Sequence, residues 1–426
     1  MRKLLIAAAI ASAGMSNSAL AQNIAITGAK IYTQTEQGIV ENGTLLIRDG
    51  TIESISTDSN VPDGYREYDA SGKVVTPGLV GAMTSLGLVE VESWAGVVDA
   101  SVGDASVSHS GAAFDVSYAI NPDSTVLDVS RIEGVTSAAT TISYTDYLFQ
   151  GQGSVISLGE DAAIIKPRAF TVLDVGGNGA EHSGGSRAAL WVTLEKLFDE
   201  AGGLSEVPGL DTVWEGLNTR ADIEALQRIL SGDMPLVMEA ERKSDILQIL
   251  AFKKRHPEVK IILMDAAEAW RVADQLAEAS IPVIMNPEMN LPDSFEAIGA
   301  SIENAARLAK AGVKVAVGME THNIRLATQH AGNAVANGLS HEEGIASLTS
   351  NPASILGVSD RVGSLAAGKQ ADVVIWSGDP LEVTEYAEQV FIKGEPIDMD
   401  TRQTELRDRY QNFYGQDGKT SQYVQP

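Results

Sequence analysis

Residues 74–87, VVTPGLVGAMTSLG, and residues 351–374, NPASILGVSDRVGSLAAGKQADVV, are the two stretches that decide how this chain is organised. Between them, short apolar runs typical of strands alternate with Ala- and Glu-rich amphipathic stretches typical of helices. The clearest apolar runs are residues 235–238, 259–264, 281–285 and 313–317. Repeated strand–helix units over this length predict an α/β fold, either a parallel barrel or a doubly wound sheet.

A second pattern, of short strands without long helices between them, lies on both sides of this segment. Residues 43–52 contain alternating apolar residues and an Asp-Gly step, which predicts a β-hairpin. Residues 371–376 and 389–392 return to strand-like sequence near the other end. We therefore expect a small β-sandwich that is composite, with strands from both chain ends.

The first residues are typical of an export signal. A basic pair at residues 2 and 3 precedes an apolar run at residues 4–11, and Ala-Leu-Ala follows at residues 19–21. This pattern predicts a signal peptide cleaved after Ala21, and the alternative is a retained N-terminal anchor. No other apolar run is long enough to span a membrane, so we expect an exported protein, periplasmic in a Gram-negative host.

The predicted organisation has four parts. Residues 1–21 form the signal peptide, residues 22–76 plus 359–400 the composite β-sandwich, residues 77–358 the barrel, and residues 401–426 a polar C-terminal helix and tail.

Composition excludes several classes of function. The 426 residues include 31 Lys and Arg against 57 Asp and Glu, a formal charge of −26. A field of this sign repels phosphate backbones, so we expect no nucleic acid partner. The absence of Cys excludes thiol nucleophiles, disulfides and Cys-ligated metal sites.

The two opening stretches resemble the amidohydrolase superfamily. Residues 74–87 are similar to the beginning of its first barrel strand, and residues 351–374 to the end of its barrel. Between them, residues 151–156 and 268–274 resemble the imidazolonepropionase-like branch. The resemblance implies a TIM (β/α)8 barrel with a composite β-sandwich, a site at the C-terminal ends of the strands, and hydrolysis of C–N bonds in non-peptide or cyclic amides.

The family's divalent metal is held partly by a His-x-His pair after the Pro-Gly-Leu turn. In this chain those two positions hold Met83 and Ser85. A thioether and a neutral hydroxyl are poor ligands for zinc. We therefore expect the metal site of this chain to be degenerate compared with that of the family.

Three acidic residues stand where the family's later strands carry site residues. Glu239 follows the expected fifth strand, Asp265 the sixth, and Glu320 the eighth, where the family places its general base. They could form a site with oxygen ligands only, which would favour a hard divalent cation such as Mg²⁺, Mn²⁺ or Ca²⁺. Alternatively, they are solvated acids that pair with Arg242 or Arg325, and no cofactor binds.

No pair of histidines has the spacing of a metal-binding helix. The six are His109, His182, His256, His322, His330 and His341. His322 lies just beyond the eighth predicted strand, followed by Asn323, and could exchange a proton with a substrate or bind its carbonyl group. We expect His256 and His341 to be solvated, and His330 to pack inside a helix.

The stretch at residues 174–187 is rich in Gly and ends in Arg187. It could form a mobile lid, with Arg187 binding an anionic substrate group, or a plain surface loop. Arg187, Arg242 and Asn323 are the predicted substrate-binding residues, and Glu320 and His322 the predicted catalytic ones.

Three classes of function remain open. The chain could be a hydrolase with an unconventional site, a non-catalytic periplasmic protein that binds a small molecule, or a subunit that assembles with a metal-competent homologue. It could also form a homo-oligomer. Fold alone does not choose among these classes.

Overall fold

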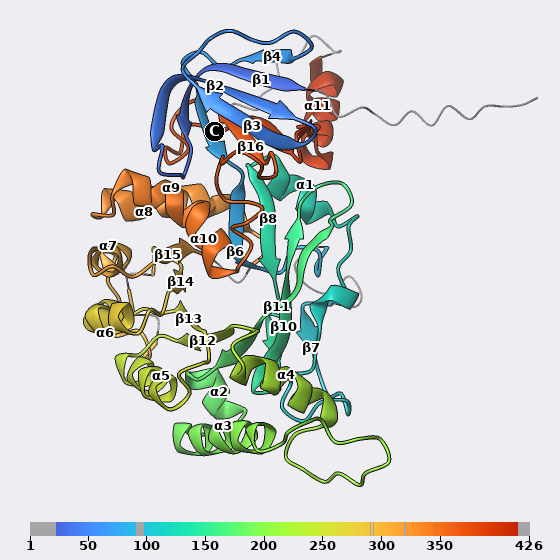
Figure 1. The fold of residues 1–426 in the computed structure, drawn as a ribbon, viewed down its shortest axis with the longest axis vertical. Coiled ribbons are helices and arrows are strands. Elements are labelled where there is room, and N and C mark those ends of the chain that lie inside the picture. The colour runs from blue at the N-terminus through green and yellow to red at the C-terminus, as the bar shows by residue number, and fades with distance from the viewer. Residues whose placement is uncertain (1–22, 91–97, 290, 293, 319–320, 416–426) are drawn as a thin grey trace, which may run out of the picture.

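A computed structural model describes residues 23–90, 98–289, 291–292, 294–318 and 321–415. Figure 1 shows two parts, a sheet at one end of the molecule and a larger barrel with its helices below it. The predicted signal peptide lies outside the described residues. Within them, no helix is long and apolar enough to cross a membrane.

Eight strands form the barrel, in the order in which they follow one another along the chain. An isolated parallel bridge between Thr84 and Thr321 joins its two edges. The strands are β6 (Leu79–Thr84), β8 (Val135–Thr140), β10 (Phe149–Ser157), β11 (Ile164–Asp174), β12 (Leu236–Ala240), β13 (Ile261–Asp265), β14 (Val283–Met285) and β15 (Val315–Val317). The predicted α/β barrel is therefore confirmed.

One barrel strand departs from the regular strand–helix repeat. β10 pairs antiparallel with both β8 and β11, whereas the other neighbouring strands pair parallel. The segments before and after β10, residues 141–148 and 158–163, are shorter than the dozen or so residues that a parallel crossover needs. The short connections therefore dictate the reversed direction.

Apolar side chains from all eight strands fill the inside of the barrel. They include Val80, Ala82, Met83, Ala139, Val155, Phe170, Val172, Val237, Ile262, Met264, Ile284 and Ala316. Two glycines let the wall close around this core. A Cβ on Gly153 would lie 2.3 Å from the Phe170 ring, and one on Gly318 would lie 2.4 Å from Cγ2 of Ile284.

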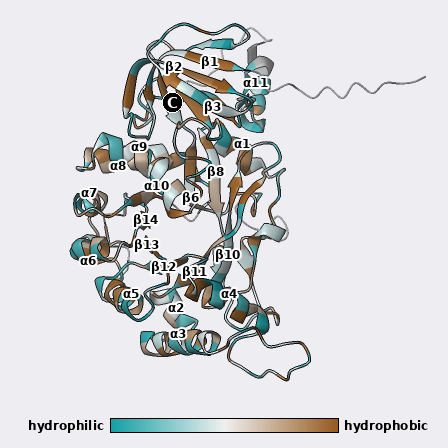
Figure 2. Cartoon of the chain, in the orientation of Figure 1, coloured by the Kyte–Doolittle hydropathy of each residue, from teal (hydrophilic) through white to brown (hydrophobic). Residues whose placement is uncertain are grey.

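Helices cover the outer face of the barrel, with their hydrophilic sides outward (Figure 2). α4 begins with a capping box, in which Thr219 and Asp222 bond each other's backbone N–H, and it buries Ile223, Leu226 and Ile229. These helices are α1 (Thr125–Arg131), α2 (Gly177–Glu181), α3 (Arg187–Gly202), α4 (Arg220–Leu230), α5 (Lys243–Arg255), α6 (Ala273–Glu278), α7 (Asn304–Lys310), α8 (Ala327–Ala336), α9 (His341–Leu348) and α10 (Ser350–Ile355). A further helix, α11 (Arg402–Gly415), lies beside the other sheet (Figure 1).

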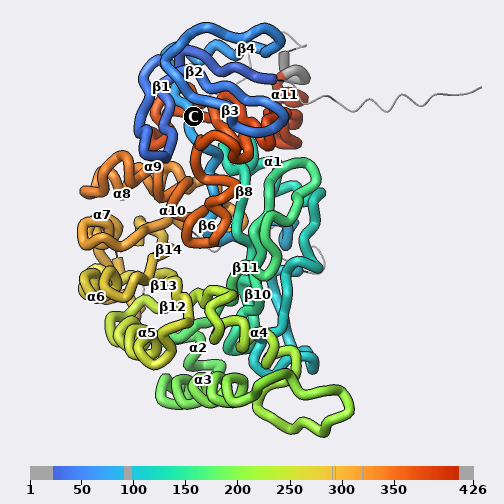
Figure 3. The backbone as a smooth tube through the Cα atoms, in the orientation of Figure 1, coloured from blue at the N-terminus to red at the C-terminus, as the bar shows by residue number. Residues whose placement is uncertain are grey.

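The second sheet combines strands from both chain ends, which lie side by side in Figure 3. β5 and β16 pair antiparallel, with Val75 opposite Ile375, and the Trp376 indole N–H donates to Thr76 Oγ1 at 2.9 Å across this join. The strands are β1 (Ile24–Tyr32), β2 (Ile39–Arg48), β3 (Thr51–Ser56), β4 (Arg66–Asp69), β5 (Val74–Pro77), β16 (Val373–Trp376), β17 (Ala387–Ile392) and β18 (Glu395–Pro396). The composite sheet is thus confirmed.

The predicted hairpin is also present, between β2 and β3. Asp49 and Gly50 at its turn have φ angles of 49° and 75°. Positive φ at both central residues matches the twist of the flanking strands, which explains the Asp-Gly step.

Candidate functional site

Acidic residues lie at or next to the last position of three consecutive strands at the C-terminal mouth of the barrel. Asp174 is the last residue of β11 and pairs in register with Glu239 of β12, and Ala240 pairs with Asp265 of β13. Neighbouring parallel strands end at the same edge, so these carboxyl groups gather at the end of the barrel where enzymes of this architecture work.

Asp174 belongs to this group although the sequence indicated only the start of a Gly-rich loop. Its Oδ1 accepts a hydrogen bond of 2.6 Å from the Gly176 N–H. Burial raises the pKa of the Asp174 carboxyl, while the N–H groups of Gly176 and Gly179 act in the opposite direction. An acid directly after the apolar run at residues 169–173 was the available signal in the sequence.

Glu239 is buried, and its carboxylate accepts a hydrogen bond from a residue of β10. Gln150, near the start of β10, donates from Nε2 to Glu239 Oε1 at 3.0 Å. Because β10 runs antiparallel, it brings its first residues, and not its last, to the mouth. Sequence reasoning that assumed a regular repeat could not identify Gln150.

Asp265 has an unusual backbone. Its φ is 67° and that of Ala266 is 60°, so two consecutive residues with side chains adopt the left-handed conformation. The Ala266 N–H bonds the Ala240 carbonyl oxygen at 3.1 Å and helps hold this bend. Such conformations cost about 1–3 kcal/mol each and concentrate at functional sites.

Asp265 is exposed to solvent at the mouth, although the surrounding protein partly desolvates its carboxyl group. This desolvation, together with the nearby Asp174 carboxylate, raises the pKa of Asp265 to about 6. Two carboxyl groups that repel each other when both are ionised therefore lie at one edge of the mouth.

A cavity of about 210 Å³ opens beside Asp174. The short helix α2 and the segment before β10 form its walls, so part of the Gly-rich stretch borders the cavity. The lining residues are Ser143, Tyr144, Thr145, Tyr147, Leu148, Gln150, Asp174, Asn178, Glu181 and His182.

Met83 and Ser85, which the sequence resemblance placed at the positions of a His-x-His pair, are both buried. Met83 packs in the apolar interior of the barrel. The Ser85 N–H bonds the Thr321 carbonyl oxygen at 3.3 Å, where the last strand region meets the first.

The same contact brings the predicted residues His322 and Asn323 beside the end of β6. Both are partly buried, and Asn323 Oδ1 accepts a bond of 2.9 Å from Arg325 Nε. Glu320, predicted as catalytic and as a metal ligand, lies outside the described residues.

Arg187 and Arg242, predicted to bind substrate, meet in one network of charges. Asp245 accepts from both guanidinium groups at 3.0 Å, and Glu296 pairs with Arg187 and lies 3.8 Å from Arg242. Two positive groups thus face two negative ones, and the network links the starts of α3 and α5 to the segment after β14.

Histidines expected outside the site have carboxylate neighbours. His330 is buried in α8 with Nδ1 2.9 Å from Glu288, and His341 Nε2 lies 2.7 Å from Asp379. Across the described part of the chain, no group of three or more His, Asp and Glu side chains is arranged to hold a metal ion.

Comparisons with known proteins agree with this architecture. The model of the amidohydrolase family matches residues 218–397. The solved structure of an amidohydrolase from Thermotoga maritima MSB8 is 26% identical, covers 88% of this chain and 99% of that one, and superposes with a TM-score of 0.77.

Two curated relatives match locally. Imidazolonepropionase of Brevibacillus brevis is 38% identical over 68 residues, 14% of this chain and 15% of that protein. Amidohydrolase tasK of Hapsidospora irregularis is 44% identical over 57 residues, 13% of this chain and 6% of that protein. The matched regions thus span only a small part of either relative. The family model, the structural neighbour and the barrel all support a likeness to the amidohydrolase superfamily, and the local match with imidazolonepropionase supports a likeness to that branch.

Proposed function

We propose that this protein is an exported hydrolase that cleaves a C–N bond of a small molecule, such as a cyclic amide, with carboxyl groups at the barrel mouth. The observation that carries this proposal is the strained, solvent-accessible Asp265 beside the Asp174 carboxyl. Asp174 ends β11 and Asp265 ends β13 at the same edge of the barrel, and a left-handed bend beside two such acids is a feature that concentrates at functional sites.

The described residues do not fit the metal centre that the family implies. Met83 packs among apolar side chains where an imidazole ligand is needed, and Ser85 offers only a neutral hydroxyl. We therefore propose a degenerate metal site, and the chemistry below uses only side chains of this chain.

In the proposed reaction, the Asp265 carboxylate accepts a proton from a water molecule as the water oxygen bonds to the amide carbon. The C–N bond then breaks, and the proton passes to the leaving nitrogen, so atoms and charge balance. Asp265 suits this task by position, because solvent reaches it while Glu239 is buried and bonded to Gln150.

The cavity beside Asp174 limits the substrate. A volume of about 210 Å³ lies below the range of about 300–1,000 Å³ typical of drug-sized ligands. We therefore propose a compact substrate, and a small lactam or cyclic imide is preferred over a long peptide.

Turnover of a panel of lactams, cyclic imides and dipeptides tests the proposal. We compare the unchanged protein with Asp265→Asn, because Asn tolerates the left-handed conformation and removes only the base. Asp274→Asn, on the exposed face of α6, is the matched control for charge.

We expect Asp265→Asn to lower kcat/KM by about 10²–10⁴-fold and Asp274→Asn to leave it within twofold. Equal activity of the unchanged protein and Asp265→Asn would refute the role of Asp265. Metal analysis of the same samples separates the carboxyl mechanism from one with an oxygen-ligated cation.

A second candidate is a protein that binds a small molecule without turnover, alone or as a partner of a metal-competent homologue. The absence of a metal-holding group of His, Asp and Glu from the described chain favours it. No turnover on the whole panel, with saturable binding that Asp174→Asn abolishes, would support this candidate. Export is tested separately by N-terminal sequencing, with cleavage expected after Ala21.

A further inference from the structure

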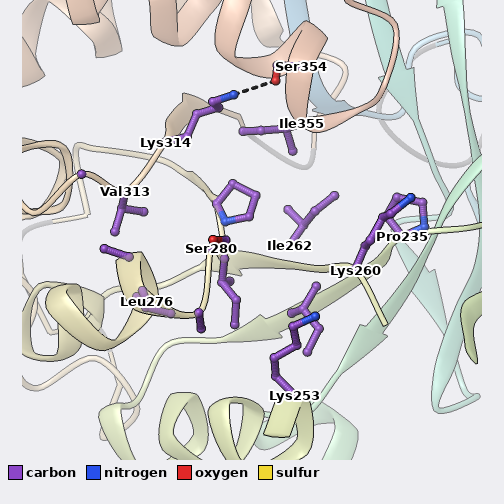
Figure 4. A pocket seen from close by; sticks show the side chains of 16 residues that line it. Pro235, Lys253, Lys260, Ile262, Leu276, Ser280, Val313, Lys314, Ser354 and Ile355 are labelled. Carbon is purple, nitrogen blue, oxygen red and sulfur yellow. Dashed lines mark hydrogen bonds between the residues drawn. The ribbon is translucent and has the colours of Figure 1, made fainter. Parts of the chain in front are cut away.

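A second cavity opens at the opposite end of the barrel from the acids. Its volume is about 490 Å³, and it lies between the N-terminal ends of β12 to β15 and the helices α5, α6 and α10. Ile262, Leu276 and Ile355 are among its apolar walls (Figure 4). It therefore shares no lining residue with the cavity at the mouth.

The charge of this cavity is the reverse of that of the whole molecule. Lys253, Lys260 and Lys314 line it, and no Asp or Glu does. The chain nevertheless carries 57 acidic residues against 31 basic ones. In the described part of the chain, none of the three lysines forms an ion pair with a carboxylate.

Two of the three ammonium groups are already held in place. Lys253 Nζ donates to the carbonyl oxygens of Pro257 and Val259 at 2.6 and 2.8 Å. Lys314 Nζ donates to Ser354 Oγ at 2.6 Å, the bond drawn in Figure 4. An ammonium group has three donors, so Lys253 keeps one and Lys314 two for another acceptor. Side chains ordered in advance lose less entropy on binding.

Like charges remain close together here. Burial lowers the pKa of Lys166, on β11, and the positive charge of Lys260 adds to this effect, while the carboxylate of Asp360 acts in the opposite direction. Lys166 is itself held by the carbonyl oxygen of Leu356 at 3.1 Å. Like charges held close together destabilise the protein, and a bound anion would relieve the repulsion between them.

We propose that this cavity binds a small organic anion that has an apolar body and a carboxylate or phosphate group. The apolar walls match the body, and Lys260 and Lys314 on the rim match the charge. The volume lies within the range of small-molecule sites.

Calorimetric titration of the full mature chain with benzoate and with phenyl phosphate tests this site, with neutral benzamide and inorganic phosphate as comparison probes. The test variant is the double substitution Lys260→Gln and Lys314→Gln. Lys254→Gln is the matched control, because Lys254 is exposed on the same helix as Lys253 but does not line the cavity. Ala277→Leu fills the cavity and leaves its charges unchanged.

We expect benzoate or phenyl phosphate to bind in the unchanged protein and in Lys254→Gln with affinities within twofold of each other. The double variant and Ala277→Leu should each weaken binding at least tenfold. Thermal melting shows that the variants fold, since removing like charges should leave Tm unchanged or raise it. Absence of binding, equal binding of benzamide, equal binding of inorganic phosphate, or an equal loss in Lys254→Gln would each overturn the proposal.

Discussion

Replacing Asp372 by Asn should change how the stability of the protein depends on pH. Asp372 directly precedes β16 and is only 3% exposed. Its carboxyl accepts two bonds of 2.9 Å from Gln370 Nε2 and one of 2.9 Å from the Lys393 N–H. Burial outweighs these bonds and raises the pKa of Asp372 from 3.8 to about 6.

The direction and the size of this pH dependence follow from the difference between the pKa of Asp372 in the folded and in the unfolded protein. Between pH 3.8 and about 6, the folded protein holds a proton on Asp372 that the unfolded chain has lost, so the free energy of unfolding falls as pH rises. At about 1.4 kcal/mol per pH unit, the full difference is about 3 kcal/mol, of which roughly 2–3 kcal/mol falls between pH 4 and 7. Asn does not titrate and lacks this contribution.

Urea unfolding of both proteins at pH 4, 5, 6 and 7 measures the effect. The free energy of unfolding of the unchanged protein, minus that of Asp372→Asn, should fall by roughly 2–3 kcal/mol over this range. Other titrating groups cancel in the subtraction. A difference that stays constant within 0.5 kcal/mol, or that rises with pH, would refute the assigned burial of this carboxyl.

Two further predictions concern closure of the barrel and the charge network at its mouth. Gly318→Ala should lower the free energy of unfolding by about 1–3 kcal/mol, because its Cβ would lie 2.4 Å from a methyl carbon of β14. Gly103→Ala, which has nothing within 4 Å, should change the urea midpoint little, and equal losses would contradict the packing argument. Arg187→Met should cost about 1–3 kcal/mol, because the buried Asp245 loses one of its two guanidinium partners. Lys196→Met removes an exposed pair and should cost less than about 1 kcal/mol, so a comparable loss there would argue against the network.

The candidate site was only partly predictable. Glu239 and Asp265 each follow an apolar strand run, and the structure brings both to the mouth. Asp174 also ends an apolar run, but the Gly-rich residues after it indicated a loop. Gln150 depends on the reversed direction of β10, which follows from two short connections and not from the residues of the strand.

The cavity lined by lysines was even less predictable from the sequence. Lys253, Lys260 and Lys314 are separated by up to about 60 positions in the chain, and none has a motif around it. Only the winding of β12 to β15 brings their strand beginnings to one end of the barrel.

The sequence by itself determined the α/β class, the strand–helix segment between two β segments, and the Asp-Gly hairpin. These features depend on the period of apolar residues and on turn chemistry, which act between near neighbours in the chain. Tertiary structure alone decided which carboxyl groups meet at the mouth, which lysines gather at the other end, and the left-handed backbone at Asp265. The physical reason is that desolvation and the repulsion of like charges depend on distances across strands, and strand register and direction set those distances.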